Sequence, residues 1–359
     1  MEEDISVPID ALGRFAEALL AKLGVPAEDA RVTAELLLDT DLRGIESHGM
    51  AHLVDFYVRR IQSGEIEPRP TFATTHDALS AATIDGGRGL GFVVGERAMR
   101  LAIEKARATG SGWVSVGNST HYGAGSCYAM MALPENMIGF SFTTGGRRMT
   151  PPGGLGRTMG LNVISVAAPT PRGFPYVLDM ATSVVAAGKL EIAQRRGTPV
   201  PEGWAVDAEG RPLTDPQAWD QSCMLLPLGG LASTGAFKGF GLAILVDILT
   251  GALSGFGTST EIDGGRNAAQ CFGALRIDAF VELETYMERM GGMIDAIKRT
   301  PTLEGVDEVR IPGELEHALA ESRRKAGTVP MHPAVLDGFR QAADELGVPF
   351  DLVSEGATA

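Results

Sequence analysis

The sequence predicts an α+β fold with a helical N-terminal part and a mixed, largely antiparallel β-sheet in the middle of the chain. Residues 8–43 carry apolar side chains at helical spacing, with Leu12, Phe15 and Leu19 on one stripe. From about Ala81 onward, short β-rich runs follow one another and are separated by proline and glycine. This punctuation favours a mixed or antiparallel sheet over regular strand–helix–strand repeats, and helical composition returns in the last third.

The expected elements are placed by their spacing and by the residues that separate them. Two helices fill 8–43 and end at Gly44, and a third runs from about Gly49 to Ile61 with Ser47 as its N-cap. Later helices are expected at 94–108, 121–133, 181–195, 239–253, 280–298, 313–326 and 333–345. Strands are expected at SAATID, GWVSVGN, IGFSFT, NVISVAAP and FPYVLDM.

These elements divide the chain into three parts. Residues 1–75 form a helical N-terminal region, 76–300 hold the mixed sheet, and 301–359 return as helices that pack on the first region. The apolar stretch from Gly239 to Gly255 is short for a membrane span and carries Asp247 in its middle. We therefore expect a buried helix there.

Composition and charge exclude several classes of partner. The net charge of −14 and the pI near 4.9 argue against a general affinity for nucleic acid or anionic membranes, because both are polyanions. Cys127, Cys223 and Cys271 lie far apart and fit no zinc spacing, so we expect no metal and a reducing compartment. The N-terminus lacks a basic and apolar leader, and we therefore expect a cytoplasmic protein.

The glycine-rich segments are informative because of what they do not match. A dinucleotide-binding GxGxxG follows a strand and opens a helix. The clusters GGRGLGF and PGGLGRTMG fit neither that pattern nor the spacing of a P-loop. If the chain binds a nucleotide, it does so by another architecture.

The segment DLRGIESHGMAHL, residues 41–53, places Ser47 and His48 where a loop enters the third expected helix. The positive end of a helix disfavours an imidazolium ion and so lowers the pKa of a histidine in the first turn. Carbonyl reduction needs a proton donor titrating near neutrality, because charge builds on the oxygen. Ser47 would then hydrogen-bond the ring or the substrate. The alternative is that Ser47 is an ordinary N-cap and His48 a surface residue.

The segment STHYGAGSCYA, residues 119–129, leads from a β-rich run into a helix of small residues. Gly123 and Gly125 would let the backbone approach a ligand closely, and the free N–H groups of a helix start would favour phosphates. The alternative is a tight strand–helix turn in which His121 is buried and hydrogen-bonded.

Two charged residues stand at the ends of apolar elements. Asp179, in YVLDMATS, can accept hydrogen bonds from a ribose or can cap a helix that begins near Thr182. Lys238 precedes an apolar helix, where a cation is unfavourable unless an anion shares the site. A phosphate or carboxylate neighbour and a solvated lysine are the two interpretations.

Eight segments follow one another in a distinctive order along nearly the whole chain. They are DLRGIESHG, FYVRRIQSGEI, STHYGAGSCYA, PPGG, LDMATS with AAGKLEIAQRRGTPVPEGWAVDAEGRPLTDP, LLPLGG, KGFGLAILVDILTGALSG and IPGELE. Together they resemble the type-2 malate/L-lactate dehydrogenase family. That family includes ureidoglycolate, sulfolactate and diketogulonate oxidoreductases and the reductases of cyclic imino acids.

The resemblance implies a fold, a cofactor and a set of site residues. It implies a helical N-terminal part and a largely antiparallel sheet that binds NADH or NADPH in a non-Rossmann manner, with active sites between the subunits of a homodimer. His48 looks like the proton donor and Ser47 like its partner, although ureidoglycolate-type members use the histidine that matches His121 as acid–base. The implied cofactor contacts are His121, Tyr122, Gly123, Ala124, Asp179, Met180, Ala181, Lys238, Gly313 and Glu314.

The chain departs from the family pattern at two places. The family usually has an arginine four residues after His48, where it holds the substrate carboxylate as a bidentate fork. Here that position is His52, a weaker and pH-dependent anchor. The family usually reads GTNP where this chain reads GLNV, which alters the substrate wall around Asn162. Arg147 and Arg148 are candidates for a replacement anion clamp.

The sequence thus predicts hydride transfer between NADH or NADPH and a 2-oxo acid, a cyclic imino acid or a related small carbonyl compound. His48 supplies the proton, and the site excludes water. A serine hydrolase is excluded because no G-x-S-x-G elbow is present. A catalytically silent homologue that only binds NAD(P), or one repurposed for a carbonyl substrate that is not an acid, is the remaining alternative.

Overall fold

The computed structural model describes residues 4–262 and 267–353, and a seven-stranded sheet lies at its centre. The strand order is β2-β3-β4-β12-β5-β8-β9, in which β3 and β4 are parallel and the other neighbours antiparallel. The strands are β2 (Ala73–Asp77), β3 (Ala81–Asp85), β4 (Ser111–Ser119), β5 (Met137–Thr143), β8 (Val163–Ala168), β9 (Tyr176–Ala181) and β12 (Ala268–Arg276). The expected mixed and mainly antiparallel sheet is confirmed.

Two smaller sheets complete the β-structure of the described residues. One has four short strands in the order β10-β11-β6-β7. These are β6 (Arg147–Met149), β7 (Met159–Gly160), β10 (Ala205–Val206) and β11 (Met224–Leu225). The other pairs β1 (Ile5–Pro8) with β13 (Thr328–Met331) in antiparallel register. This pairing brings the two ends of the described chain together.

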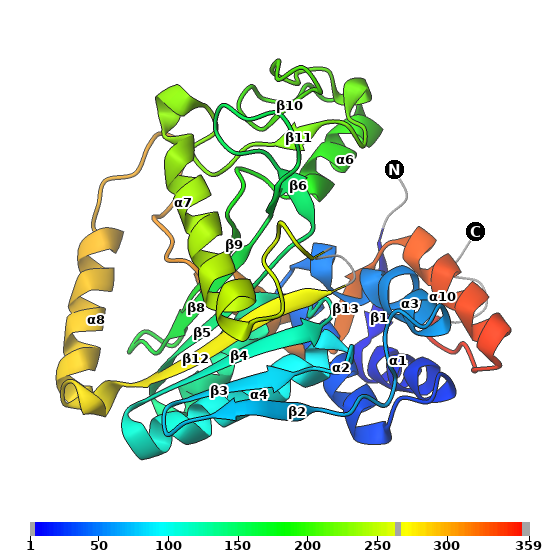
Figure 1. Cartoon of the computed structure of the whole chain (residues 1–359), viewed down its shortest axis with the longest axis horizontal. Helices are drawn as coiled ribbons and strands as arrows, with labels where there is room; N and C mark the ends of the chain where they lie inside the picture. Colours follow the sequence, from blue (N-terminus) through cyan, green and yellow to red (C-terminus); the bar gives the residue numbers. More distant parts are fainter. Residues whose placement is uncertain (1–3, 263–266, 354–359) are drawn as a thin grey trace.

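The helices form layers around the large sheet (Figure 1). They are α1 (Ile9–Lys22), α2 (Ala27–Leu42), α3 (Arg59–Gln62), α4 (Gly91–Thr109), α5 (Gly125–Ala129), α6 (Ala187–Arg196), α7 (Ala236–Asp247), α8 (Leu283–Lys298), α9 (Glu314–Ala326) and α10 (Pro333–Leu346). Helix α4 packs on one face of the sheet through Ala98 and Met99, and α7 packs on the other through Val246. Figure 1 shows α8 standing away from the body beside α7.

The largest apolar core joins the two ends of the chain. Leu12, Phe15 and Leu19 of α1 pack in one buried cluster with Leu336 and Phe339 of α10. Alternation of apolar residues at helical spacing explains why these faces turn inward. In Figure 1 the first and last helices gather at the same side of the large sheet. The N-terminal helices are therefore held in place by the last part of the described chain.

The segment after Ser47 differs from the expected continuous helix. It forms two 3₁₀ turns, Glu46–His48 and Met50–His52, followed by a π-helical stretch Leu53–Val58 that leads into α3. Ser47 is therefore no N-cap, and His48 does not lie in the first turn of an α-helix. A π-helical stretch holds one residue more per turn than an α-helix, and such stretches are frequent at functional sites.

Two later helices also differ from expectation. The 181–195 helix begins only at Ala187, because β9 continues to Ala181. Helix α7 and the π-helical stretch Ile248–Ala252 are buried on one face only, because apolar side chains on their outer face are exposed. Within residues 4–262 and 267–353, no helix has the length and apolar character to cross a bilayer.

Candidate active site

Three histidines from two separate segments lie in one cluster, which we call the histidine triangle. The ring centroids of His48 and His121 are 5.6 Å apart, those of His48 and His52 are 5.9 Å apart, and those of His52 and His121 are 6.2 Å apart. His121 follows β4, and the other two come from the 3₁₀ turns that precede α3. No group of three metal-binding side chains among the described residues is arranged to hold an ion. The ring distances show that the two segments singled out in the sequence, 41–53 and 119–129, lie side by side in the fold.

A buried carboxylate holds the turn that carries His48. Oδ2 of Asp41 accepts a hydrogen bond of 2.8 Å from the backbone N–H of Met50. A side chain at Gly49 would collide with this carboxylate, so glycine is required there. Burial raises the pKa of Asp41 to about 7, against the opposing effect of the Met50 hydrogen bond. Asp41 lies in the DLRG segment that precedes the histidine, and it was not singled out in the sequence analysis.

The protonation of His121 follows from its hydrogen bonds. Tyr57 Oη lies 2.7 Å from Nδ1 of His121, and the backbone N–H of Gly123 lies 3.4 Å from the same atom. A backbone N–H can only donate, and burial raises the pKa of Tyr57, which keeps its hydroxyl protonated. Nδ1 therefore accepts both bonds, and the single proton of the neutral ring lies on Nε2. Burial also lowers the pKa of His121 well below its usual value.

His48 is poised as a neutral imidazole. Nδ1 of His48 lies 2.9 Å from the hydroxyl oxygen of Ser47. Burial, with a smaller contribution from His52, lowers the pKa of His48 to about 4. The direction agrees with the sequence expectation, but the cause is burial and not a helix dipole. A neutral imidazole whose Nδ1 is hydrogen-bonded offers Nε2 as the atom that takes or gives a proton.

His52 stands between an aromatic ring and charges of both signs. Its Nδ1 is buried without a partner among the described residues, and its ring contacts Phe56 edge to face at 5.2 Å. The Arg60 guanidinium lies 3.7 Å above the Phe56 ring. Burial lowers the pKa of His52, Asp55 and Glu191 act to raise it, and Arg60 acts to lower it. A neutral His52 cannot serve as a charged carboxylate anchor at neutral pH.

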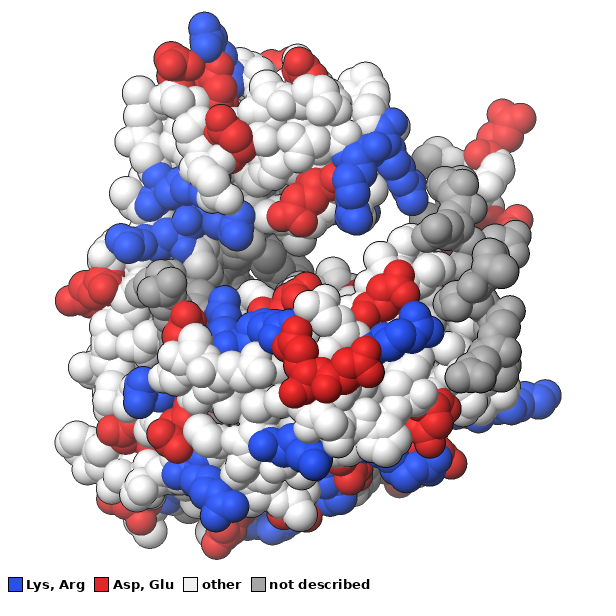
Figure 2. Space-filling model, turned by 90° about the vertical axis from the view of Figure 1, so that its right-hand side faces the viewer, with Lys and Arg blue, Asp and Glu red and all other residues white. Residues whose placement is uncertain are grey.

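Glu191, whose negative charge acts to raise the pKa of His52, also lines a pocket. Glu191 lies on α6, and it lines an open pocket of about 300 Å³ together with Arg148, Gln194, Trp219, Asp220 and Gln221. Figure 2 shows this side of the molecule hollowed between an upper part, which holds α6 and the four-stranded sheet, and a lower part with the N-terminal helices. Arg148 therefore shares this pocket with Glu191 of α6, whereas Arg147 does not line it.

The expected cofactor residues around Asp179 form a second polar group. Oδ2 of Asp179 accepts a hydrogen bond of 2.7 Å from the backbone N–H of Ser126 at the start of α5. It thus caps α5 and not a helix near Thr182. Burial raises the pKa of Asp179, opposed by the Ser126 hydrogen bonds and by Arg43.

Arg43 is 5% exposed, and its Nε and Nη2 have no partner among the described residues. A buried cation beside the backbone of α5 and the carboxylate of Asp179 suits a ligand rich in hydroxyl and phosphate oxygens. The residues present therefore fit a nicotinamide dinucleotide.

Two of the predicted site residues, Asn162 and Tyr122, make hydrogen bonds inside the fold. Asn162 is fully buried, and its amide donates to the carbonyl of Ala243 at 2.8 Å and accepts from the Gly145 N–H and the Ser259 hydroxyl. Tyr122 is buried in the sheet core, where its hydroxyl accepts a hydrogen bond from Ser141. These contacts hold the fold together, and the predicted contacts of Asn162 and Tyr122 with a ligand stay predictions.

Other expected contacts lie apart from the histidine triangle. Glu314 pairs with Lys298 at 2.6 Å, and the Gly313 turn packs against Val177 of β9. Lys238 is exposed in the first turn of α7, and no described contact joins it to the histidines or to Asp179. Gly123, Ala124, Met180 and Ala181 lie in the same segments as His121 and Asp179.

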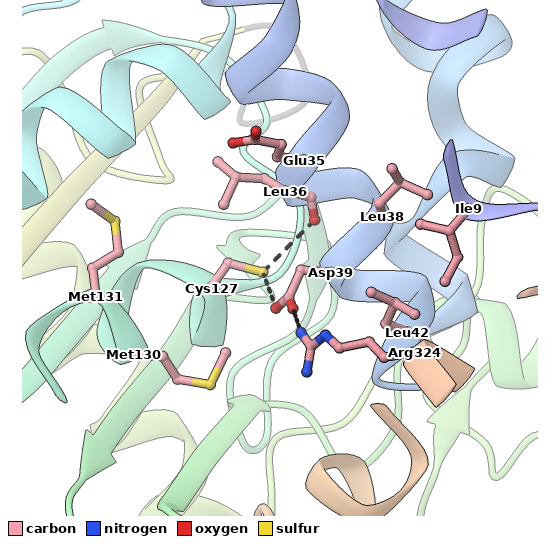
Figure 3. A pocket seen from close by; sticks show the side chains of 10 residues that line it. All are labelled: Ile9, Glu35, Leu36, Leu38, Asp39, Leu42, Cys127, Met130, Met131 and Arg324. Atoms are coloured by element: carbon pink, nitrogen blue, oxygen red, sulfur yellow. Dashed lines mark hydrogen bonds and ion pairs between the residues drawn. The ribbon is translucent and has the colours of Figure 1, made fainter. Parts of the chain in front are cut away.

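A second and larger pocket lies on the far side of α5. It measures about 490 Å³, and Figure 3 shows Cys127, Met130 and Met131 facing Leu36 and Asp39 of α2 across it. The remaining lining residues are Ile9, Glu35, Leu38, Leu42 and Arg324. Arg324 pairs with Asp39 at 2.7 Å. None of the three clustered histidines lines this pocket.

Comparison with known proteins agrees with the order of the motifs. Residues 7–340 match the family model described as malate/L-lactate dehydrogenase. A malate dehydrogenase of Pyrococcus abyssi is 43% identical over 97% of this chain and 96% of its own length. An L-sulfolactate dehydrogenase of Methanocaldococcus jannaschii is 34% identical over 92% of this chain and 94% of its own.

The solved structure of malate dehydrogenase from Pyrococcus horikoshii superposes with a TM-score of 0.89 at 40% identity, covering 97% of both chains. The chain therefore belongs to the malate/L-lactate dehydrogenase family and is an oxidoreductase.

Proposed function

We propose that this enzyme transfers a hydride between a nicotinamide cofactor and a 2-hydroxy acid, a 2-oxo acid or a cyclic imino acid, with the histidine triangle as its acid–base centre. The observation that carries the proposal is the pair of neutral imidazoles, His48 with its Nδ1 hydrogen-bonded to Ser47 and His121 with its proton on Nε2. The names of the malate and sulfolactate relatives support 2-hydroxy acids as the substrate class.

The two histidines divide the proton chemistry between them. In the oxidation direction, Nε2 of His48 accepts the hydroxyl proton as the carbon loses its hydride. Nε2–H of His121 donates a hydrogen bond to the same oxygen and stabilises the charge that develops there. Ser47 fixes the orientation of the His48 ring through Nδ1. In the reduction direction, His48 returns the proton to the oxygen.

Arg148 is our candidate for the residue that holds the substrate carboxylate. The lowered pKa of His52 leaves that ring uncharged at neutral pH. Arg148 carries a permanent charge, and it shares a pocket with Glu191, which acts on His52. A guanidinium fork also gives a carboxylate two parallel hydrogen bonds. His52 and Phe56 then form an apolar wall that helps to exclude water.

The nicotinamide supplies the hydride acceptor and donor when it is bound. His121, Gly123, Ala124, Asp179, Met180 and Ala181 would hold it in a non-Rossmann manner, because the chain has no GxGxxG segment. Lys238, Gly313 and Glu314 stay as further candidates from the family pattern. NADH and NADPH are both candidates for the cofactor.

A homodimer is the assembly that the surface of the molecule favours. Four apolar side chains on the outer face of α7 and the stretch after it are 44–63% exposed: Phe237, Leu245, Ile248 and Leu253. Met293 and Ile297 of α8 are also exposed, by 49% and 40%. A second copy would remove these side chains from water, as in other symmetric oligomers. The three-part division of the chain and a cytoplasmic location complete the proposal.

The test is binding followed by turnover. Purified protein should enhance NADH or NADPH fluorescence and gain thermal stability with the preferred nucleotide, because a ligand stabilises the state that binds it. With that nucleotide, absorbance at the nicotinamide band should report reduction of pyruvate or oxaloacetate. If neither nucleotide binds at millimolar concentration, the proposal is wrong at its base.

A further inference from the structure

The open pocket lined by Glu191, the carboxylate that acts to raise the pKa of His52, holds charged side chains of both signs. Its side chains come from β6, from α6 and from the loop 219–221, and they include one cation and two carboxylates: Arg148, Glu191 and Asp220. At about 300 Å³ the pocket lies at the small end of ligand sites and suits the side chain of a small acid.

The side chains of Arg148 and Glu191 make no hydrogen bond or ion pair with any of the described residues. The other polar groups of the pocket are engaged. Asp220 accepts hydrogen bonds from the N–H and the hydroxyl of Ser222 at 2.7 and 2.6 Å, which lower its pKa and keep it ionised. Gln194 donates to the carbonyl of Trp219 at 3.1 Å. Arg148 and Glu191 are therefore the groups left to recognise a ligand.

The charge balance of the pocket changes once substrate is bound. When the Arg148 guanidinium holds the carboxylate next to the reacting carbon, the remaining charges are those of Glu191 and Asp220. A second carboxylate on the substrate would face both of them and would be repelled. A chain ending in a cationic nitrogen would instead receive a charge-assisted hydrogen bond from Glu191.

We propose that this pocket is a specificity site for 2-oxo acids whose side chain ends in an amino or guanidino group, with Glu191 as the residue that selects the cation. The inference rests on the proposed function, because it assumes hydride transfer at the histidine triangle. The reaction is unchanged: the hydride adds to the oxo carbon and the proton to its oxygen. The pocket determines only which chain is accepted.

The experiment compares 2-oxo acids that differ in the group at the end of the side chain, with the purified enzyme and its preferred nicotinamide. We measure kcat/KM for 2-oxo-5-guanidinopentanoate, for apolar 2-oxohexanoate and for the dicarboxylate oxaloacetate. The guanidino acid should exceed the apolar acid by about tenfold, the usual worth of one charge-assisted hydrogen bond in a partly open site. Oxaloacetate should be the poorest of the three.

Variants of Glu191 test the selecting residue itself. In Glu191→Gln the ratio of guanidino to apolar acid should fall to near one, and in Glu191→Lys the preference should move to oxaloacetate. Using the ratio removes any general effect of the variant on the histidines. Glu202→Gln, which changes an exposed acid that does not line the pocket, is the matched control and should leave the ratio unchanged.

The outcomes separate the pocket from the reaction. If oxaloacetate is the best substrate, or if Glu191→Gln keeps the wild-type ratio, the pocket assignment is overturned while the proposed function stands. If no 2-oxo acid, 2-hydroxy acid or cyclic imino acid is turned over although nucleotide binds, both are overturned. A preference for the guanidino acid that Glu191→Gln abolishes supports the assignment.

Discussion

The hydroxyl of Tyr57 lies 2.7 Å from Nδ1 of His121 and joins two segments that are 64 residues apart in the chain. Tyr57 belongs to the π-helical stretch after the SHG turn, and His121 belongs to the loop between β4 and α5. The contact fixes both the orientation and the tautomer of His121. It therefore connects the helical N-terminal part to the sheet that bears the expected cofactor residues.

Replacing Tyr57 by phenylalanine should loosen His121 without disturbing the core. The variant leaves Nδ1 with the longer contact to Gly123 as its remaining donor, so the tautomer is less strongly selected. We expect kcat to fall about tenfold, in line with roughly 1–3 kcal/mol for a buried group that loses its partner. Nucleotide affinity, followed by fluorescence, should change little. A kcat equal to that of the wild type would show that the tautomer of His121 does not matter for the chemistry.

His48→Ala should abolish most of the turnover. A positioned acid–base group is worth roughly two to four powers of ten in rate, so kcat should fall by that amount while cofactor affinity is kept. Steady-state kinetics with a good 2-oxo acid measure the effect. If His48→Ala keeps its kcat and His121→Ala loses it, the acid–base role belongs to His121.

The pH dependence of oxidation should reflect the burial of His48. Its pKa of about 4 means that the free enzyme carries the neutral, proton-accepting form throughout the range from pH 6 to pH 8. Oxidation of the hydroxy acid should therefore show a flat kcat/KM between pH 6 and pH 8 and a decline only as the pH falls towards 4. A profile with its midpoint near 6.5, the value of an unburied histidine, would contradict this picture.

The residue that holds the carboxylate can be identified from KM. A histidine anchor would make KM rise between pH 6 and pH 8 as the ring loses its charge, whereas an arginine does not titrate there. Because burial lowers the pKa of His52, we expect a flat KM and a rise of tenfold or more in Arg148→Ala. Arg147→Ala, which changes the exposed neighbour, should have a smaller effect. If KM instead rises steeply with pH in the wild type, His52 is the anchor.

A charge on the outer face of α7 should separate the proposed dimer. Ile248 and Leu253 are 53% and 60% exposed, and a second copy would bury them. Ile248→Glu should place an unpaired carboxylate in that interface and yield a monomer at micromolar concentration in sedimentation experiments. Glu209→Gln, at an exposed acid outside this face, is the control. A wild-type monomer with full activity would rule out the shared assembly.

The sequence motifs that carry the histidines could be recognised locally, but their proximity in the fold could not be predicted. The SHG and HYG segments could each be recognised by composition, yet nothing in the spacing of His48 and His121 says that their rings lie 5.6 Å apart. The sheet was predictable because proline and glycine separate its strands. Asp41 was missed because an aspartate at the end of a helix has many ordinary explanations, and only the space at Gly49 reveals its role.

Two predictions, a single helix after Ser47 and a fully buried helix at 239–253, were wrong for reasons that the sequence pattern alone does not reveal. The 3₁₀ and π-helical turns around His52 are three to six residues long, too short for their apolar spacing to differ visibly from that of an α-helix, so the pattern after Ser47 predicted a single helix. Helix α7 carries apolar side chains on its inner and its outer face, and such a pattern fits burial within one chain as well as burial against another. Glu191 was not singled out, because its effect on the pKa of His52 depends on how the folded chain brings α6 and the segment of His52 together.

Because β1 pairs with β13, the first strand cannot find its partner until synthesis of the chain is nearly finished. Ile5 is synthesised long before its partner Met331, by an interval of roughly 16–65 s at 5–20 residues per second. Throughout that interval the apolar faces of α1 and α2 lack the C-terminal helix that covers them, so they are a natural target for chaperones. A nascent chain stalled before Thr328 would already contain the SHG turn, but it would have no finished core to hold the turn in place. The residue proposed to move the proton is thus among the first to be made and among the last to be positioned.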